Sequence, residues 1–455
     1  MATDKRYKKR KKKGGIIGKI IAVIVICIAG GIFAKIGLPI ILNEKKSINP
    51  QQFEPNLSAD KEHNNSESFN DRSEEELLIE SQESVSSEAE KEMKSSEEIE
   101  KECDSWIEAK LEGMELDEKA AQLFFVSVDT LSQVENTTIA EDAFKERFSA
   151  YPVGGIALLN GNIVNPEQLK SLTQTIGELS NERIGLNPFV GVAEEGGSVL
   201  QIANKPEFGL NDVGKMNDIG AGDEPEAAYK VGDYIGSYLS EYGINVDFAP
   251  VADVIYNSSN SVVDGRAFGQ DPNLVSEMVS KEVEGLQKSN VSAVLKHFPG
   301  HGTTEGDPSE GDAVSQRTLT ELETTDYAPF RKGIEAGADF VMVGHIIMKN
   351  VSQEEVPASV SSYFMTDILK NEWGYDGIII TDDISMAAIS NRFSPADAAV
   401  AAINAGADMI YTTSDFDEAY QGIVDGVNQG VISSDRIDES IRRILRIKYM
   451  KQFNG

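Results

Sequence analysis

The chain has little cysteine and little histidine. Its 455 residues include two cysteines, Cys27 and Cys103, and four histidines. Cys27 lies inside an apolar segment, so the two thiols are poorly placed to pair, and no disulfide framework or cysteine-based metal cluster is predicted. We expect Cys103 to be a free thiol, with a bridge to a second chain as the alternative. We expect neither a cofactor nor a metal ion.

Positive charge is scarce as well. The sequence contains 75 acidic and 42 basic residues, which gives a formal net charge of −33. Residues 1–13 form a dense basic cluster, so everything after residue 43 is more acidic than the net charge suggests. Such a surface repels phosphate polymers, so nucleic acid is not an expected partner. The charge favours solubility and suits a neutral or cationic ligand.

Long apolar runs are confined to residues 14–42. Lys19 and Lys35 flank the densest stretch and can extend toward the two membrane interfaces. A helix of about 20 apolar residues crosses the hydrocarbon core, so we predict a transmembrane signal-anchor. The basic residues 1–13 predict a cytoplasmic N-terminus and an extracellular C-terminal domain, that is, a single-pass protein of the cell membrane. The alternative is a cleaved signal peptide, whose apolar stretch is usually shorter.

Residues 43–104 are rich in Ser, Glu and Asn and poor in apolar side chains. A segment of this composition cannot bury enough surface to offset the loss of chain entropy. We predict a disordered stalk here, followed by a globular domain over residues 105–455.

The globular part alternates short β-rich runs with longer helical stretches. Continuous apolar strands alternating with helices are typical of a parallel sheet. The sequence therefore predicts an α/β fold, a (β/α)8 TIM-type barrel, with a doubly wound open sheet as the alternative. Eight strands are predicted, at residues 123–128, 154–159, 189–194, 246–250, 291–297, 340–346, 377–382 and 409–413. The main helices are predicted at residues 166–179, 224–242, 275–288, 326–336, 362–373, 395–405 and 437–450.

Polar residues follow several of these strands, where the active residues of such barrels collect. Three of the four histidines, His297, His301 and His345, lie at or just after predicted strand ends. Asp382 ends a very apolar strand, and a carboxylate there is costly unless it is paired or used. Because neighbouring strand residues face opposite ways, only one of Asp382 and Asp383 should point into a pocket.

The turn at residues 296–302, Lys-His-Phe-Pro-Gly-His-Gly, combines a cation, a directional donor and a tight backbone. Pro299 and the two glycines bring backbone close to a ligand. Metal binding by the two histidines is the alternative, although no HExxH-type spacing supports it.

A collinear series of motifs is similar to glycoside hydrolase family 3, in its β-N-acetylglucosaminidase branch. The resemblance covers about residues 105–452 and runs through residues 243–253, 265–269, 296–302, 341–345, 357–359 and 380–383. It implies the barrel and retaining hydrolysis of β-linked sugars, such as N-acetylhexosamine-type glycans of the cell wall. The second domain of larger members would begin where this chain ends, so a one-domain form is expected.

The resemblance also implies roles for single residues. Asp382 matches the nucleophile, whose attack on the anomeric carbon forms a covalent glycosyl-enzyme that water then hydrolyses with retention. Three residues match sugar-binding positions, namely Arg266, Lys296 and His297. We also expect substrate contacts from Glu195, His301 and His345.

The chain departs from the family at the acid/base. Members of the branch carry an Asp-Ser-His motif after the glycine-rich turn, and its histidine transfers the proton. Here the sequence is Asp307-Pro308-Ser309, and Ser309 is a poor acid. A carboxyl near Asp382 with a raised pKa could replace it. Glu310 is the first candidate, Asp307 the second, and Glu305 lies on the same loop.

A second departure lies in the loop that begins at residue 193. Ala193, Ser198 and Gln201 stand where the branch carries an aspartate and two arginines that hold the outer hydroxyls of the sugar. The two departures keep open an alternative function, a degenerate member of the family that binds wall glycans or partners without hydrolysis.

Overall fold

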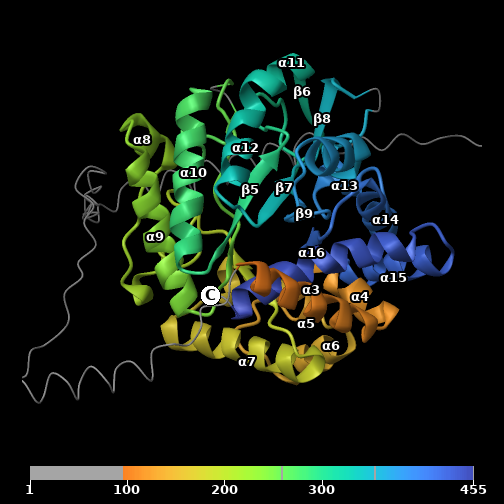
Figure 1. The fold of residues 1–455 in the computed structure, drawn as a ribbon. Helices are drawn as coiled ribbons and strands as arrows, with labels where there is room; N and C mark the ends of the chain where they lie inside the picture. Colours follow the sequence, from red (N-terminus) through yellow and green to blue (C-terminus); the bar gives the residue numbers. More distant parts are fainter. Residues whose placement is uncertain (1–95, 258–259, 353–354, 454–455) are drawn as a thin grey trace, which may run out of the picture. The chain divides into compact units, whose positions relative to one another are not determined.

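The computed structural model describes residues 96–257, 260–352 and 355–453. Eight parallel strands, hydrogen-bonded in the order β10-β1-β2-β3-β4-β5-β7-β9, form its centre (Figure 1). A bridge between Ile380 and Met409 joins the two outer strands of that order, so the sheet is a nearly closed barrel. The predicted barrel is confirmed, and the open-sheet alternative is not. The strands are β1 (Phe124–Ser127), β2 (Gly155–Ala157), β3 (Phe189–Val192), β4 (Val246–Asp247), β5 (Ser292–Phe298), β7 (Phe340–Val343), β9 (Ile378–Thr381) and β10 (Ile410–Thr412).

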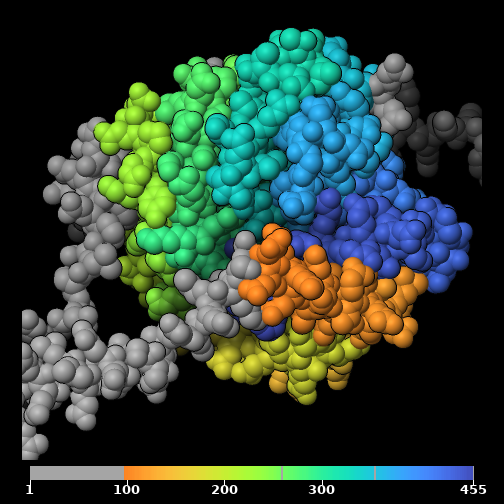
Figure 2. Space-filling model, viewed as in Figure 1, coloured from red at the N-terminus to blue at the C-terminus, as the bar shows by residue number. Residues whose placement is uncertain are grey.

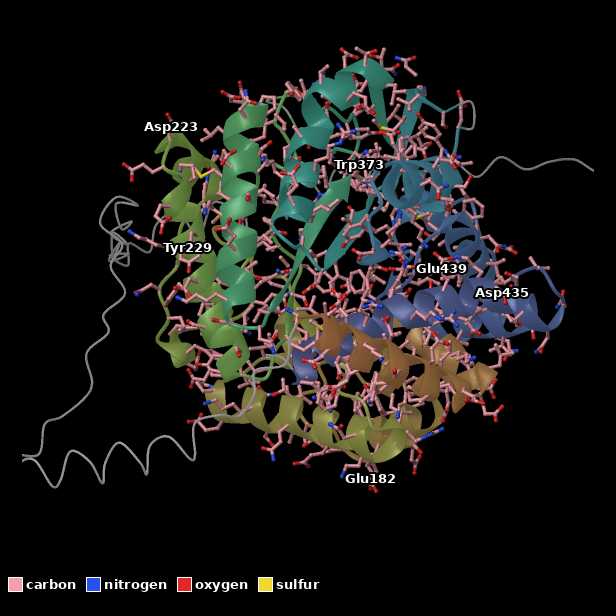
Figure 3. The ribbon with its side chains drawn as sticks, viewed as in Figure 1. Glu182, Asp223, Tyr229, Trp373, Asp435 and Glu439 are labelled. Atoms are coloured by element: carbon pink, nitrogen blue, oxygen red, sulfur yellow. The ribbon has the colours of Figure 1, made fainter. Side chains whose placement is uncertain are left out.

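Helices follow the strands and cover the outside of the barrel (Figure 1). Every predicted helix is present, and the predicted helix at residues 362–373 is wound as a π-helix, η7. In Figure 3 acidic side chains stand out from the outer surface, such as Glu182 on α7, Asp435 on α16 and Asp223 in the turn before α9. The main helices are α7 (Pro166–Ile184), α9 (Pro225–Glu241), α10 (Pro272–Lys288), α12 (Tyr327–Glu335), η7 (Tyr363–Glu372), α14 (Pro395–Ala405), α15 (Phe416–Asn428) and α16 (Ser434–Phe453).

Aromatic rings fill the barrel interior. The ring of Phe125 lies with its centroid 5.2 Å from that of Phe248 and 6.5 Å from that of Phe189. Gly155 and Gly191 make room for it, since a Cβ atom at either position would approach the Phe125 ring to 2.5 Å or 2.7 Å. The barrel is therefore a packed core, and ligands have access only at its ends.

A small parallel sheet was not predicted. Strands β6 (Ala313–Thr318) and β8 (Ile346–Asn350) pair with each other, outside the barrel. The predicted strand at residues 340–346 is therefore two strands, because β7 ends at Val343 and β8 begins at Ile346. The loop between β5 and β6 carries residues 299–312, so the small sheet fixes the far end of that loop.

The predicted boundary between stalk and barrel is wrong. Helix α3 (Ser96–Glu112) begins within the predicted stalk, and Cys103 is fully buried as a free thiol. Cys103, Ile107 and Leu111 recur every four residues and form an apolar stripe that requires a partner. That partner is α16, where the Trp106 ring lies 5.2 Å from the Tyr449 ring. In Figure 2 α3 and α4 (Leu116–Gln122), in orange, form one surface with the blue helices α15 and α16.

The predicted membrane anchor and the rest of the stalk lie outside the described residues. Among the residues that the structure describes, no helix has both the length and the apolar character needed to cross a membrane.

Candidate active site

A cavity of about 410 Å³ opens at the C-terminal ends of the barrel strands. It contains most of the predicted site residues, which lie at the ends of β3, β5 and β9 or in the loops that follow β4 and β5. Its polar lining consists of Glu195, Arg266, Lys296, His297, His301, Asp307, Ser309 and Asp382.

Asp382 follows β9 and is 7% exposed. The backbone N–H of Asp383 donates to its Oδ1 at 2.8 Å, and its own N–H donates to the carbonyl oxygen of Val343 at 3.0 Å. Burial alone would raise the pKa of Asp382, but the imidazoles of His345 and His297 and the Asp383 N–H together lower it. Asp382 is therefore an ionised carboxylate that faces a cavity, which is what a nucleophile requires.

Asp383 faces away from the cavity, as the alternation along a strand predicts. Its Oδ1 accepts hydrogen bonds from the N–H groups of Ser385 at 2.9 Å and Thr413 at 3.2 Å, and its Oδ2 accepts from the Thr413 hydroxyl. Asp383 thus ties β9 to the end of β10 directly behind Asp382.

Glu195 organises the two cations of the site. Its carboxylate accepts from Nε and Nη2 of Arg266 at 2.7 and 2.6 Å, and it lies 2.5 Å from Nζ of Lys296. Burial would raise the pKa of Glu195, but Lys296 and Arg266 lower it to about 2. Both carboxylate oxygens of Glu195 are already paired with these cations. Its role is therefore to position Arg266 and Lys296 for a ligand, in place of the direct substrate contact that was expected.

His297 is oriented by a buried carboxylate that the sequence reasoning did not single out. Asp253 accepts from His297 Nδ1 at 2.8 Å and from the His301 N–H at 2.6 Å. Nδ1 therefore carries the proton, and Nε2 of His297 is available to a ligand. The sequence does contain a signal for this pair. Asp253 follows the fourth predicted strand and His297 ends the fifth, so the two side chains are expected at neighbouring strand ends.

His301 also lines the cavity, although it is only 1% exposed. Its Nδ1 lies 2.6 Å from the hydroxyl of Thr304. Within the described part of the chain, Nε2 of His301 has no hydrogen-bond partner. Burial and the neighbouring His297 lower the pKa of His301, so the ring is kept neutral.

His345 does not line the cavity, which differs from the expected substrate contact. The side chain is fully buried, its Nε2 donates to the carbonyl oxygen of Asp383 at 2.8 Å, and its Nδ1 lies 2.7 Å from the Ser359 hydroxyl. The sequence shows that His345 follows a strand but not which side of that strand end it occupies.

The loop after the glycine-rich turn brings Asp307 and Ser309 to the cavity. The N–H and hydroxyl of Ser309 both donate to Oδ1 of Asp307, at 2.8 and 2.7 Å. Glu310, the first candidate for the acid, is exposed and is not among the residues that line the cavity, and Glu305 is exposed as well. The tight turn around Pro308 accounts for this, because residues 307–309 face the cavity and Glu310 has already turned away from it.

One wall of the cavity is apolar at the site of the second departure. Ala193 and Val199 line it, whereas Ser198 is exposed and the backbone N–H of Gln201 donates to Glu194. Glu194 also accepts from the N–H groups of Ile202 and Ala203, so it closes the loop that carries Ala193 and Glu195.

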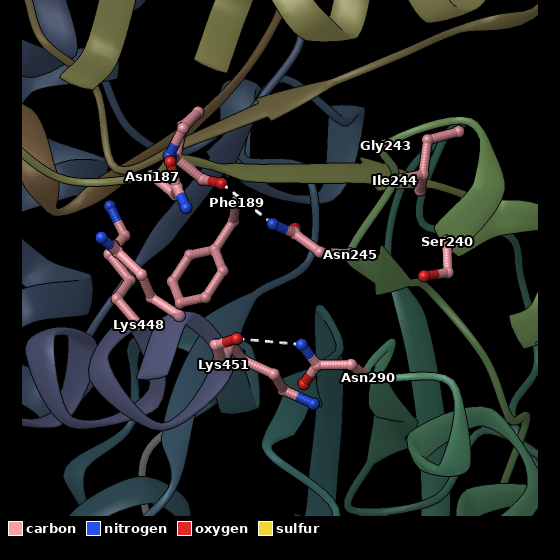
Figure 4. A pocket seen from close by; sticks show the side chains of 11 residues that line it. Asn187, Phe189, Ser240, Gly243, Ile244, Asn245, Asn290, Lys448 and Lys451 are labelled. Carbon is pink, nitrogen blue, oxygen red and sulfur yellow. Dashed lines mark hydrogen bonds between the residues drawn. The ribbon is translucent and has the colours of Figure 1, made fainter. Parts of the chain in front are cut away.

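A second cavity, of about 210 Å³, lies at the opposite end of the barrel, where β3, β4 and β5 begin (Figure 4). Phe189, Asn245, Asn290, Lys448 and Lys451 line it, and no carboxyl side chain does. It therefore lacks the chemistry of the first cavity.

A parallel barrel that gathers an ionised aspartate, cations and imidazoles at its C-terminal mouth has the arrangement of a barrel enzyme. Residues 115–447 match the Glycosyl hydrolase family 3 N terminal domain, and the chain belongs to this family. The resemblance seen in the sequence is thereby confirmed.

Relatives and solved structures agree with this assignment. The chain is 31% identical to Beta-hexosaminidase A of Pseudoalteromonas piscicida over 67% of this chain and 54% of that protein. It is 32% identical to a Beta-hexosaminidase of Nitrosomonas eutropha over 63% of this chain and 80% of that protein. A family 3 β-N-acetylglucosaminidase from Paenibacillus sp. is 32% identical, with a TM-score of 0.70 over 75% of this chain and 64% of that structure. The chain thus spans about half of the Pseudoalteromonas relative.

Proposed function

We propose that the protein is a retaining glycoside hydrolase that acts on β-linked N-acetylhexosamine-type sugars through a covalent intermediate on Asp382. The observation that carries the proposal is the buried Asp382 carboxylate, ionised at the bottom of a cavity lined by Arg266, Lys296 and His297. The β-hexosaminidase relatives support the choice of sugar.

The chemistry follows from these groups. A carboxylate oxygen of Asp382 attacks the anomeric carbon, the bond from that carbon to the leaving oxygen breaks, and an acid protonates the leaving oxygen. In the second step a water molecule gives up a proton to the same group and attacks the anomeric carbon, which releases Asp382. Arg266 and Lys296 donate hydrogen bonds to the hydroxyls of the sugar, Nε2 of His297 accepts one, and together they fix the ring over the nucleophile.

Asp307 is our choice for the acid, since it lines the cavity and Glu310 does not. Ser309 stands at the position of the family's histidine, and its two hydrogen bonds orient the Asp307 carboxyl. Ser309 would thus orient the general acid and would not itself transfer the proton. Glu310, the first candidate from the sequence, could serve only after a change in the loop.

The site of action is proposed from the sequence alone. The basic residues 1–13 and the apolar residues 14–42 support a single-pass anchor in the cell membrane with an extracellular barrel. Wall glycans would then be the accessible substrates. Release of the barrel from intact cells by external protease tests this, and a barrel that stays protected would contradict it.

The activity is tested with the full-length chain on aryl β-glycosides of N-acetylhexosamines and on peptidoglycan fragments. We expect turnover that Asp382→Ala abolishes, and a covalent sugar adduct on Asp382 in acid-quenched samples. Glu310→Ala serves as the matched control on the same surface.

The alternative is a glycan-binding member of the family without turnover, which Ser309 and the apolar wall at Ala193 favour. It would replace our proposal if the wild type binds glycan fragments without hydrolysing any glycoside and Asp382→Ala binds them equally well.

A further inference from the structure

We propose that Asp312 and Arg392 form a clamp that docks the loop carrying Asp307 onto the segment that follows the nucleophile, so that both halves of the site are held in one arrangement. The catalytic consequence of this inference rests on the proposed function. The docking itself does not.

The loop is fixed at its two ends. At the first end Gly302 packs against the backbone of Val254, in the segment that follows β4. A Cβ atom on residue 302 would lie only 1.7 Å from the carbonyl oxygen of Val254. At the second end Glu305 and Val314 exchange two backbone hydrogen bonds of 2.9 Å each. Residues 306–312 lie between these anchors as a short excursion that has to be held by contacts of its own.

Two contacts hold that excursion, and both reach the same neighbour. The backbone N–H of Ala388 donates to the carbonyl oxygen of Pro308 at 3.0 Å. The guanidinium of Arg392 donates to both carboxylate oxygens of Asp312, from Nε at 3.2 Å and from Nη2 at 2.7 Å. This two-point pairing fixes direction as well as distance.

The neighbour is coupled directly to the nucleophile. Helix α13 (Ala387–Ser390) begins five residues after Asp382, and the Met386 N–H donates to the carbonyl oxygen of Asp383 at 3.0 Å. Met386 and Pro308 both line the cavity. The clamp therefore sets the position of Asp307 relative to Asp382 through a short and continuous chain of contacts.

The clamp is exposed enough to open. The side chains of Arg392 and Asp312 are 34% and 48% exposed. An exposed ion pair contributes little and is weakened by salt. The loop is accordingly held only loosely against the strand end, which suits a segment that must admit a sugar and release it.

The test compares wild type with Arg392→Gln, Asp312→Asn and the charge swap Asp312→Arg/Arg392→Asp, all in the full-length chain. Arg442→Gln is the matched control, because Arg442 makes a somewhat more exposed two-point pair with Glu108 far from the cavity. Amide hydrogen exchange of residues 306–312 reports docking without any need for turnover. Kinetics on a simple alkyl glycoside and on a dinitrophenyl glycoside report the position of the acid, since only the first requires protonation of its leaving group.

We expect roughly threefold faster exchange of residues 306–312 in each single variant, with partial recovery in the swap and no change in the control. Activity on the alkyl glycoside should fall roughly tenfold, as small misplacements of catalytic groups do, and activity on the dinitrophenyl glycoside should not. Unchanged exchange would overturn the clamp. Faster exchange with equal loss on both substrates would overturn its role in placing the acid. If the wild type turns over neither substrate, the proposed function fails, and exchange alone decides whether the clamp exists.

Discussion

Nε2 of His345 donates a hydrogen bond to the backbone carbonyl oxygen of Asp383 at 2.8 Å, directly behind Asp382. The Ser359 hydroxyl lies 2.7 Å from the other ring nitrogen, so the whole imidazole is committed to the protein. His345 is thus a positioning residue for Asp382 through the backbone that joins Asp382 to Asp383.

The first prediction concerns this histidine. His345→Ala should lower kcat by roughly tenfold or more with little change in KM, because the nucleophile loses its support while the sugar contacts remain. His345→Gln should recover part of the loss, since its amide can donate to the same carbonyl oxygen. Steady-state kinetics on an aryl glycoside measure both values. A rise in KM at constant kcat would show instead that His345 contacts the substrate.

The second prediction concerns proton transfer. Asp307→Ala should cripple hydrolysis of natural glycosides by about 100-fold or more, yet spare the first step with dinitrophenyl glycosides, and added azide should restore turnover. Ser309→Ala should cause a smaller loss of the same kind, because it only orients Asp307. Glu310→Ala should behave like wild type. If Asp307→Ala behaves like wild type and Glu310→Ala shows the azide-rescued loss, the acid is Glu310.

The third prediction concerns Glu195. Its pKa of about 2 lies below the ordinary value of 4.5, so the stabilisation that it provides is complete above about pH 4.5 and is lost as the pH falls toward 2. Glu195→Gln should lower the free energy of unfolding at pH 7 by about 3 kcal/mol, because two buried cations lose their carboxylate. Between pH 4.5 and 2 the difference from wild type should shrink. Urea unfolding across this range measures it, and a constant difference would disprove the assignment.

The fourth prediction concerns Lys448, at the end of the barrel where the strands begin. Its Nζ donates to the Gln122 side chain at 2.8 Å and lies 5.1 Å from the centre of the Phe189 ring, and burial lowers its pKa from 10.5 to about 7. The unfolded chain binds the proton more tightly, so Lys448 destabilises the fold most at pH 7 and below, and the cost disappears as the pH rises toward 10.5.

Lys448→Met should therefore raise the free energy of unfolding by about 1–4 kcal/mol near pH 7, and the gain should fade in alkaline buffer. Denaturant unfolding at pH 6, 8 and 10 checks the trend. Lys451→Met is the control, because Lys451 lies in the same cavity but is paired with Asp339 at 2.9 Å. A gain that did not depend on pH would mean that packing, and not charge, is responsible.

The barrel was predictable because short apolar strands alternate with longer helical stretches along the sequence. The position of Asp382 was predictable as well, since few roles suit a carboxylate after Ile378-Ile379-Ile380-Thr381. The orientation of a side chain after a strand end was not, which is why His345 was assigned to the substrate. The choice between Asp307 and Glu310 depended on one tight turn that no periodicity reveals.

The error at helix α3 has a different cause. Its apolar stripe consists of few residues within a long acidic, serine-rich region, and average composition outweighed the spacing of Cys103, Ile107 and Leu111. Only the partner surface on α16 makes that helix stable, and sequence position alone does not show that the two meet.

The pairing of α3 with α16 also determines how the domain is presented. Trp106 contacts Tyr449 and Phe453, and Lys448 and Lys451 on the same stretch of α16 line the cavity where the strands begin. The chain therefore enters the domain on the side where the strands start, whereas Asp382 lies where they end. A ligand of the cavity around Asp382 therefore reaches the barrel at the end opposite to the contact between α3 and α16.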